Sequence, residues 1–310
     1  MHAFPRLVSP GVVMLAWLLA CESAGEAPPV DTAFVTPTLP PDTAAIPTIA
    51  TSAWDRSAGS VLAIPGSAPG EALMVFPELT DTTLTDTVLF ASSRVEGLAL
   101  DLFDRSGLVT ADTVMRMPAH AWTAGCMDWP RATLRGAPLR WTVGFAAGRV
   151  TPVPLDSIEG MPAQDSSVLA AALAREASNL PDAHGSRFHG VPFLVRAAYR
   201  FRADDGSAVV IADLVRRLPL EANPQEEHTF LVAHRDSVNV PFRVVYHDRR
   251  SGSEEAFDAI ELLGAVRMGS PPHPALVLAR VGDETTAYTL LELVAPGRWQ
   301  TRWTSVTTTC

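Results

Sequence analysis

The chain contains no lysine, because all 24 of its basic residues are arginine. Schiff-base and pyridoxal enzymes need a lysine amine, and a P-loop needs a lysine on its phosphates. The Ser-x-x-Lys nucleophile of penicillin-binding enzymes and the strand lysine of kinases are missing for the same reason. The sequence therefore excludes these classes for the chain acting alone.

Charged residues are also scarce, at 19% of 310 residues, whereas apolar residues make up 47%. A disordered chain needs the opposite balance, so this composition predicts a globular region with a substantial core. Residues 22–120 carry 4 arginines against 13 acidic residues. This acidic front half disfavours nucleic acid as a partner, and it also disfavours docking on anionic lipid head groups.

The longest apolar run near the N-terminus, Leu7–Leu19, is too short to span a bilayer comfortably. Arg6 precedes it, and Leu18-Leu19-Ala20-Cys21 ends it. This ending resembles the lipobox of bacterial lipoprotein precursors. The resemblance covers only residues 1–21, and the second Leu is a less usual residue at its position.

The resemblance implies a signal peptide at residues 1–20, cleavage before Cys21, lipid on that cysteine and export to the cell envelope. Glu22 replaces the Asp associated with inner-membrane retention, which favours the outer membrane. Two alternatives stay open: an ordinary secretory signal with an incidental Cys21, and a buried helix, which Pro10 and Gly11 would weaken.

Residues 21–51 are rich in Pro, Ala and Thr and predict a semi-extended tether. Beyond it, Cys126 and Cys310 are candidates for a disulfide, which an exported compartment permits. Two independent thiols are the alternative, because a sequence does not show whether two Cα atoms approach closely enough.

The rest of the chain predicts a mainly β fold, α+β at most. Strand after strand at intervals of about 10–15 residues favours an antiparallel meander that forms a sandwich or a barrel. We divide it into a small acidic β region, 52–120, and an antiparallel β domain, 121–310, and leave open whether the two form one domain. Residues 120–136 predict a packed connection. Residues 255–266 fit a helix or, as we prefer, a strand.

One short helix is expected at 166–179, capped by Asp165 or Ser166 and stopped by Pro181. Alternation predicts a strand at 139–145, with Leu139 and Trp141 on one face. In the last long strand, the same rule places Trp299 and Trp303 on one face.

Five histidines are candidate metal ligands, of which His234 and His247 could lie on neighbouring strands: His184, His189, His228, His234 and His247, with Asp248 adjacent. They lack a recognised ligand spacing, so hydrogen-bonded or surface histidines are the simpler interpretation. Ser186 lies near His184, but no Gly-x-Ser-x-Gly elbow is present. We expect no metal and no cofactor.

Arg196, Arg200 and Arg202 are expected on one strand face, where they are a candidate anion-binding row. The alternative is cross-strand pairing of these and nearby arginines with Asp213, Glu226 and Glu227 on a solvated face. Five tryptophans could stack on sugars, but their strand positions favour core packing: Trp122, Trp129, Trp141, Trp299 and Trp303. Asp204-Asp205 predicts a plain turn rather than a calcium loop.

These observations together favour a lipid-anchored envelope protein with a non-catalytic binding or scaffolding role. Its expected partners are the membrane, through the N-terminal lipid, and an envelope protein or polymer. The alternative is an exported hydrolase, metal-assisted or Ser-based, whose site is scattered in sequence.

Overall fold

The computed structural model describes residues 54–79, 87–123, 127–136, 139–182, 186–219, 224–253 and 259–309. All of them belong to one compact unit, Ile49–Cys310. Cys21, Cys126, His184 and Cys310 lie outside the described residues, as does the predicted tether. In the described part, no helix has the length and apolar character needed to cross a membrane.

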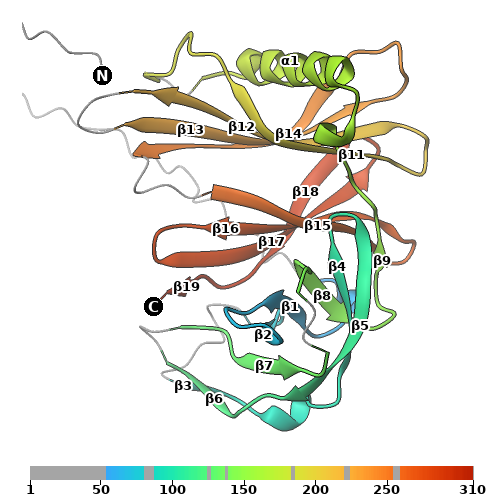
Figure 1. The fold of residues 1–310 in the computed structure, drawn as a ribbon, viewed down its shortest axis with the longest axis vertical. Coiled ribbons are helices and arrows are strands. Elements are labelled where there is room, and N and C mark those ends of the chain that lie inside the picture. Colours follow the sequence, from blue (N-terminus) through green and yellow to red (C-terminus); the bar gives the residue numbers. More distant parts are fainter. Residues whose placement is uncertain are drawn as a thin grey trace, which may run out of the picture. The chain divides into compact units, whose positions relative to one another are not determined.

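Six short antiparallel strands close into a barrel (Figure 1). Their order around it is β1 (Leu62–Pro65), β2 (Glu71–Val75), β7 (Arg131–Leu134), β5 (Gly107–Arg116), β4 (Ala99–Asp104) and β8 (Val143–Ala146). Gly144 permits this closure, because a Cβ there would lie 2.6 Å from Leu102 Cδ2. Two further strands, β3 (Thr87–Phe90) and β6 (His120–Thr123), pair with each other. The barrel thus draws strands from both sides of residue 120.

Two antiparallel sheets follow along the chain. The five-stranded sheet has the order β10 (Asp156–Ser157), β11 (Leu194–Arg202), β12 (Ala208–Leu218), β13 (Gln225–Arg235) and β14 (Arg243–Ser253). The six-stranded sheet has the order β18 (Arg298–Thr304), β17 (Thr285–Ala295), β16 (His273–Val281), β15 (Ala259–Met268) and β9 (Thr151–Pro152), with β19 (Thr308–Thr309) also paired to β17.

The six-stranded sheet lies between the barrel and the five-stranded sheet (Figure 1). One face supplies Val277 and Leu290 to the core of the barrel. The other supplies Leu276 and Leu291 to a second core, shared with the five-stranded sheet. Helix α1 (Ala163–Asn179) covers the far face of the five-stranded sheet and buries Leu173 in a third core.

Arginines tie these layers together. Arg105, in the β4–β5 turn, donates to the Leu262 carbonyl of β15 over 2.7 Å. Arg280 of β16 pairs with Asp248 of β14 at 2.5 Å, and Arg267 of β15 pairs with Asp204 at 2.7 Å. Each contact joins two different layers, so the layers are held by directed polar contacts as well as by apolar burial.

The expected mainly β fold with barrel, sandwich and one short helix is confirmed, including a strand rather than a helix at β15. The helix begins earlier than predicted. Pro162 occupies its N-cap position without a side-chain hydrogen bond, so Asp165 and Ser166 lie inside the first turn rather than capping it. The predicted connection at 120–136 contains β6, which pairs with β3, and β7, which pairs with β2 and β5 in the barrel.

The predicted strand at 139–145 is too long. Strand β8 starts only at Val143, and Leu139 is 82% exposed although Trp141 is buried. The alternation of apolar residues extends beyond the strand itself, so periodicity alone grouped the exposed Leu139 with the buried Trp141 on one face.

The prediction that Trp299 and Trp303 share a face is also wrong. Strand β18 contains a bulge, because Leu290 pairs with Trp303 whereas Leu291 pairs with Thr301. The extra residue inverts the alternation beyond it. Trp303 therefore packs against Trp54 in the first core, with ring centroids 4.8 Å apart, and Trp299 lies in the second.

A matched pair of leucines tests these assignments. Leu102→Ala should reduce the free energy of unfolding by about 2–5 kcal/mol, because it opens a cavity in the barrel. Leu139→Ala should change it by less than about 0.5 kcal/mol, because the side chain is exposed. Urea unfolding followed by circular dichroism measures both. Equal losses for the two variants would contradict the assignment of Leu139 to the surface.

Candidate functional site

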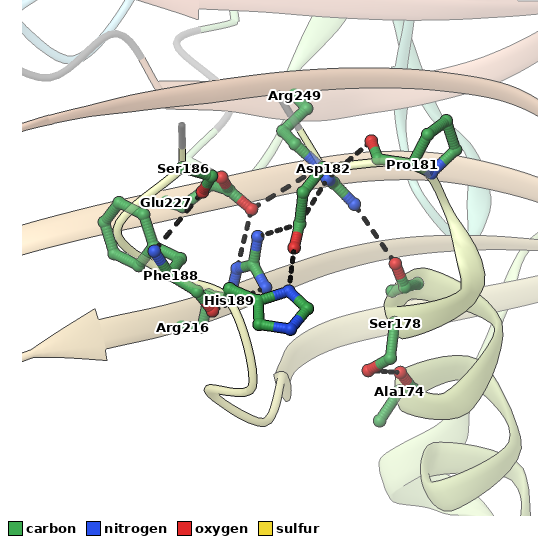
Figure 2. A network of polar contacts seen from close by, with 11 residues as sticks. Ala174, Ser178, Pro181, Asp182, Ser186, Phe188, His189, Arg216, Glu227 and Arg249 are labelled. Carbon is green, nitrogen blue, oxygen red and sulfur yellow. Dashed lines mark hydrogen bonds and ion pairs between the residues drawn. The ribbon is translucent and has the colours of Figure 1, made fainter. Parts of the chain in front are cut away.

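Arg216 of β12 is the most deeply buried cation in the described part of the chain, at 4% exposure. Figure 2 shows its surroundings. Its Nε donates to Glu227 Oε1 over 2.8 Å, its Nη2 to Asp182 Oδ1 over 2.5 Å, and its Nη1 to the Phe188 carbonyl over 2.9 Å. The ring of Phe193 lies 4.7 Å from the guanidinium carbon. A planar fork of donors suits this arrangement, which lysine could not reproduce.

Arg249 of β14 contacts the same two carboxylates. Its Nη1 donates to Asp182 over 3.1 Å, and its Nε lies 3.4 Å from Glu227. Its Nη2 donates to the Ala177 carbonyl over 3.1 Å, in the last turn of α1. A cation at a helix C-terminus is favourable, so Arg249 fixes the end of α1 against the sheet (Figure 2).

This network of two arginines and two carboxylates has no net formal charge. The hydrogen bond from Arg216 lowers the pKa of Asp182 below 3.8, and this effect outweighs burial, which raises it. The network connects the C-terminal end of α1, through the Ala177 carbonyl, and the segment that follows it, through Asp182, to strands β12, β13 and β14 of the five-stranded sheet.

The sequence missed Asp182 and Arg249, since neither stands in a motif. It did anticipate cross-strand ion pairs, and Arg196–Asp213, Arg216–Glu227 and Arg217–Glu226 are all present. Glu226 and Glu227 are buried, however, and not on a solvated face.

Two recesses of the described surface are large enough to hold a ligand. The first, which we call the inter-sheet pocket, has a volume of about 420 Å³ and lies between β11–β13 and β15–β16. Its walls are apolar, with Ile211, Phe230, Ile260 and Leu262 among them. Arg105, Arg196, Asp213 and Glu261 also line it.

The second recess, which we call the helix groove, has a volume of about 670 Å³ and lies between α1 and one end of the five-stranded sheet. Arg200, Arg202 and Arg235 line its sheet side together with Asp156. Phe242 lies under Arg235, 4.5 Å from ring centroid to guanidinium carbon. The Nε of Arg235 is buried and has no hydrogen-bond partner among the described residues.

The predicted row of three arginines is split between these recesses. A bulge in β11 pairs Val195 with Leu214 and Ala197 with Asp213, so that Arg196 is the extra residue. Arg196 therefore contacts Asp213 and lines the inter-sheet pocket, whereas Arg200 and Arg202 line the helix groove. The expectation of a shared face holds for Arg200 and Arg202 only.

The four candidate histidines within the described part of the chain do not form a metal site. His234 lies opposite Arg243 and His247 opposite Leu231, so the two are not register partners. Among the described residues, no group of three or more His, Cys, Asp or Glu is placed to hold a metal ion. His234 is buried 3.4 Å from Asp236, and His189 binds Asp182 at 3.3 Å.

His228 has a defined polar environment beside the inter-sheet pocket. Its Nδ1 lies 3.2 Å from Arg196 Nη1, and its Nε2 lies 2.8 Å from Glu226 Oε2. Because a guanidinium only donates, Nδ1 accepts and Nε2 carries the proton that Glu226 accepts.

Ser186 Oγ accepts a hydrogen bond from the Phe188 amide over 3.3 Å.

The remaining sequence candidates are structural. All five tryptophans are buried, as the core-packing prediction required. Asp204-Asp205 forms a turn, in which Asp205 accepts from the Ser207 hydroxyl over 2.5 Å and from its amide over 2.9 Å. These bonds lower the pKa of Asp205. Asp248 binds Arg280 rather than contributing to a histidine site.

Comparison with protein-family models, curated proteins and solved structures finds no match to this chain.

The pKa of Asp182 predicts how stability depends on pH. Because it lies lower in the folded than in the unfolded chain, ionised Asp182 stabilises the fold at neutral pH, and this contribution is lost as the pH falls through the folded value. The free energy of unfolding should therefore decline between about pH 5 and pH 2 less steeply in Asp182→Asn than in the wild type.

Asp156→Asn is the control, because Asp156 is exposed and 3.7 Å from Arg200. Its acid dependence should match that of the wild type. If Asp182→Asn also matches the wild type, Asp182 does not carry this contribution.

Proposed function

We propose that this chain is a lipid-anchored envelope protein that binds an acidic, partly apolar segment of a partner protein in the helix groove, without catalysis. The observation that carries the proposal is the set of arginines on the sheet side of the groove. In this proposal lipid on Cys21 supplies the anchor, and residues 22–51 form the spacer that holds the folded region away from the membrane.

The cations of the groove are available to a ligand. Arg202 donates to the Gly206 carbonyl over 3.4 Å, and Arg235 stacks on Phe242; neither has an ion pair with a described residue. Arg200 has one, with Asp156, but that carboxylate is 74% exposed and the separation is 3.7 Å. Such a surface pair is weak, so a partner's carboxylate can replace it.

Apolar side chains argue for a protein segment rather than a small anion. Val168 of α1 is 65% exposed in the groove, and Val240 also lines it. Val238, which is 72% exposed, lies two residues from Val240 in the same β13–β14 loop. Exposed apolar groups beside arginines are typical of protein interfaces, where arginine is enriched and lysine is depleted.

A peptide selection tests the groove. Phage-displayed peptides selected on the purified full-length protein should be enriched in Asp, Glu and apolar residues. Binding of the selected peptides should weaken by about tenfold or more in the double variant Arg202→Glu/Arg235→Glu, because each charge reversal turns attraction into repulsion.

The matched control is Arg298→Glu, a reversal on β18, outside the groove lining. It should leave binding unchanged. Enrichment of basic or uncharged peptides, or binding that both reversals reduce equally, would contradict the proposal.

The anchor is tested separately. Cys21→Ser should move the protein from the membrane fraction to the soluble fraction, since several acyl chains on one residue provide strong attachment. Fractionation of cells expressing each form, followed by immunoblotting, measures this. If Cys21→Ser sediments with membranes as the wild type does, the lipobox assignment is wrong.

We also propose a Cys126–Cys310 disulfide. The support comes from their neighbours, because Met127 and Thr309 exchange both backbone hydrogen bonds, at 3.0 and 3.1 Å. Antiparallel pairing that continued by one residue beyond Met127 and Thr309 would place positions 126 and 310 opposite each other. A non-reducing peptide map of the exported protein should show the two joined. Two alkylatable thiols would contradict the disulfide.

A further inference from the structure

The inter-sheet pocket is lined by charged residues of both signs and by apolar residues. Arg105 and Glu261 form one ion pair at 2.7 Å, and Arg196 and Asp213 form another at 3.6 Å. The four residues come from the β4–β5 turn, β15, β11 and β12. Three layers of the fold thus meet at this pocket.

Neither ion pair uses all of its hydrogen-bonding capacity within the described part of the chain. The Nε of Arg105 donates to the Leu262 carbonyl and its Nη2 donates to Glu261, so Nη1 has no hydrogen-bond acceptor among the described residues. The Nε of Arg196 lies beside Asp213 and its Nη1 beside His228, so Nη2 has no hydrogen-bond acceptor among the described residues. These are guanidinium donors of the kind that bind carboxylates.

Asp213 is the complementary feature. Its ion-pair partners, Arg196 and His228, lie at 3.6 and 3.8 Å, which are longer than hydrogen bonds. Its side chain is only 21% exposed. A mostly buried carboxylate whose described partners all lie beyond hydrogen-bond distance is suited to accept bonds from an ammonium group.

The apolar walls indicate a third property of the ligand, besides a carboxylate and an ammonium group. Ile211, Phe230, Ile260 and Leu262 line the pocket, whose volume of about 420 Å³ is at the lower end of that of small-ligand sites. Arg105 is held in place over the ring of Tyr199, at 5.4 Å. A ligand of this pocket therefore needs an apolar group of moderate size as well as charged groups.

We propose that the inter-sheet pocket binds a small zwitterion with an apolar side chain, that is, a hydrophobic α-amino acid or a short apolar peptide. Asp213 receives its ammonium group, Arg105 and Arg196 receive its carboxylate, and Phe230 and Ile260 contact its side chain. This site is separate from the helix groove and does not depend on the function proposed for it.

Isothermal titration calorimetry on the full-length protein tests the inference with four probes. L-Phenylalanine should bind. Three analogues should each bind about tenfold or more weakly: 3-phenylpropionate, which lacks the ammonium group, phenethylamine, which lacks the carboxylate, and glycine, which lacks the side chain.

Asp213→Asn separates recognition from a structural role. It should weaken phenylalanine to the level of 3-phenylpropionate and leave 3-phenylpropionate itself unchanged, whereas a damaged pocket would lose both. Asp156→Asn is the control and should bind phenylalanine normally. The inference is overturned if phenylalanine, leucine and leucyl-leucine give no binding at millimolar concentration, or if 3-phenylpropionate binds as tightly as phenylalanine.

Discussion

The six-stranded sheet must bury both of its faces, and the arrangement of the described unit depends on this constraint. In β16 the residues from Pro274 to Ala279 are all buried, and those of one face enter a different core from those of the other. An antiparallel sheet usually leaves one face in water, so this one needs two covers. The barrel provides one cover and the five-stranded sheet provides the other.

The five-stranded sheet then has an uncovered face of its own, on which α1 packs. That helix is rich in alanine and buries mainly Leu173 and Ala177, so its apolar contact is small. The two-arginine network compensates at its C-terminal end. Desolvation of buried ion pairs is costly, so such a network contributes to a defined position of the helix more clearly than to net stability.

Composition and periodicity predicted the fold class, most strands and the burial of the tryptophans. They failed where a bulge intervenes, because one additional residue exchanges the two faces of a strand. Arg196 and Trp303 were both misplaced in this way. The prediction for Leu139 failed for a different reason, since the alternation of apolar residues extends outside strand β8.

The candidate sites were less predictable than the fold. The sequence singled out Arg196, Arg200 and Arg202, which do line recesses, but it did not show that they line two different ones. Asp182, Arg249 and Arg235 carry no local signal, because their environment is created by strands and loops distant in sequence. Only the register of β11 to β14 brings their partners within reach.

The indole of Trp303 donates to the Pro77 carbonyl over 2.9 Å, across 226 residues of sequence. The core of the barrel likewise includes residues from Trp54 to Val306. Contacts between such distant residues carry a large loop-closure entropy and slow the folding of β proteins. During synthesis the first strands to emerge therefore cannot complete their core until nearly all of the described chain is available.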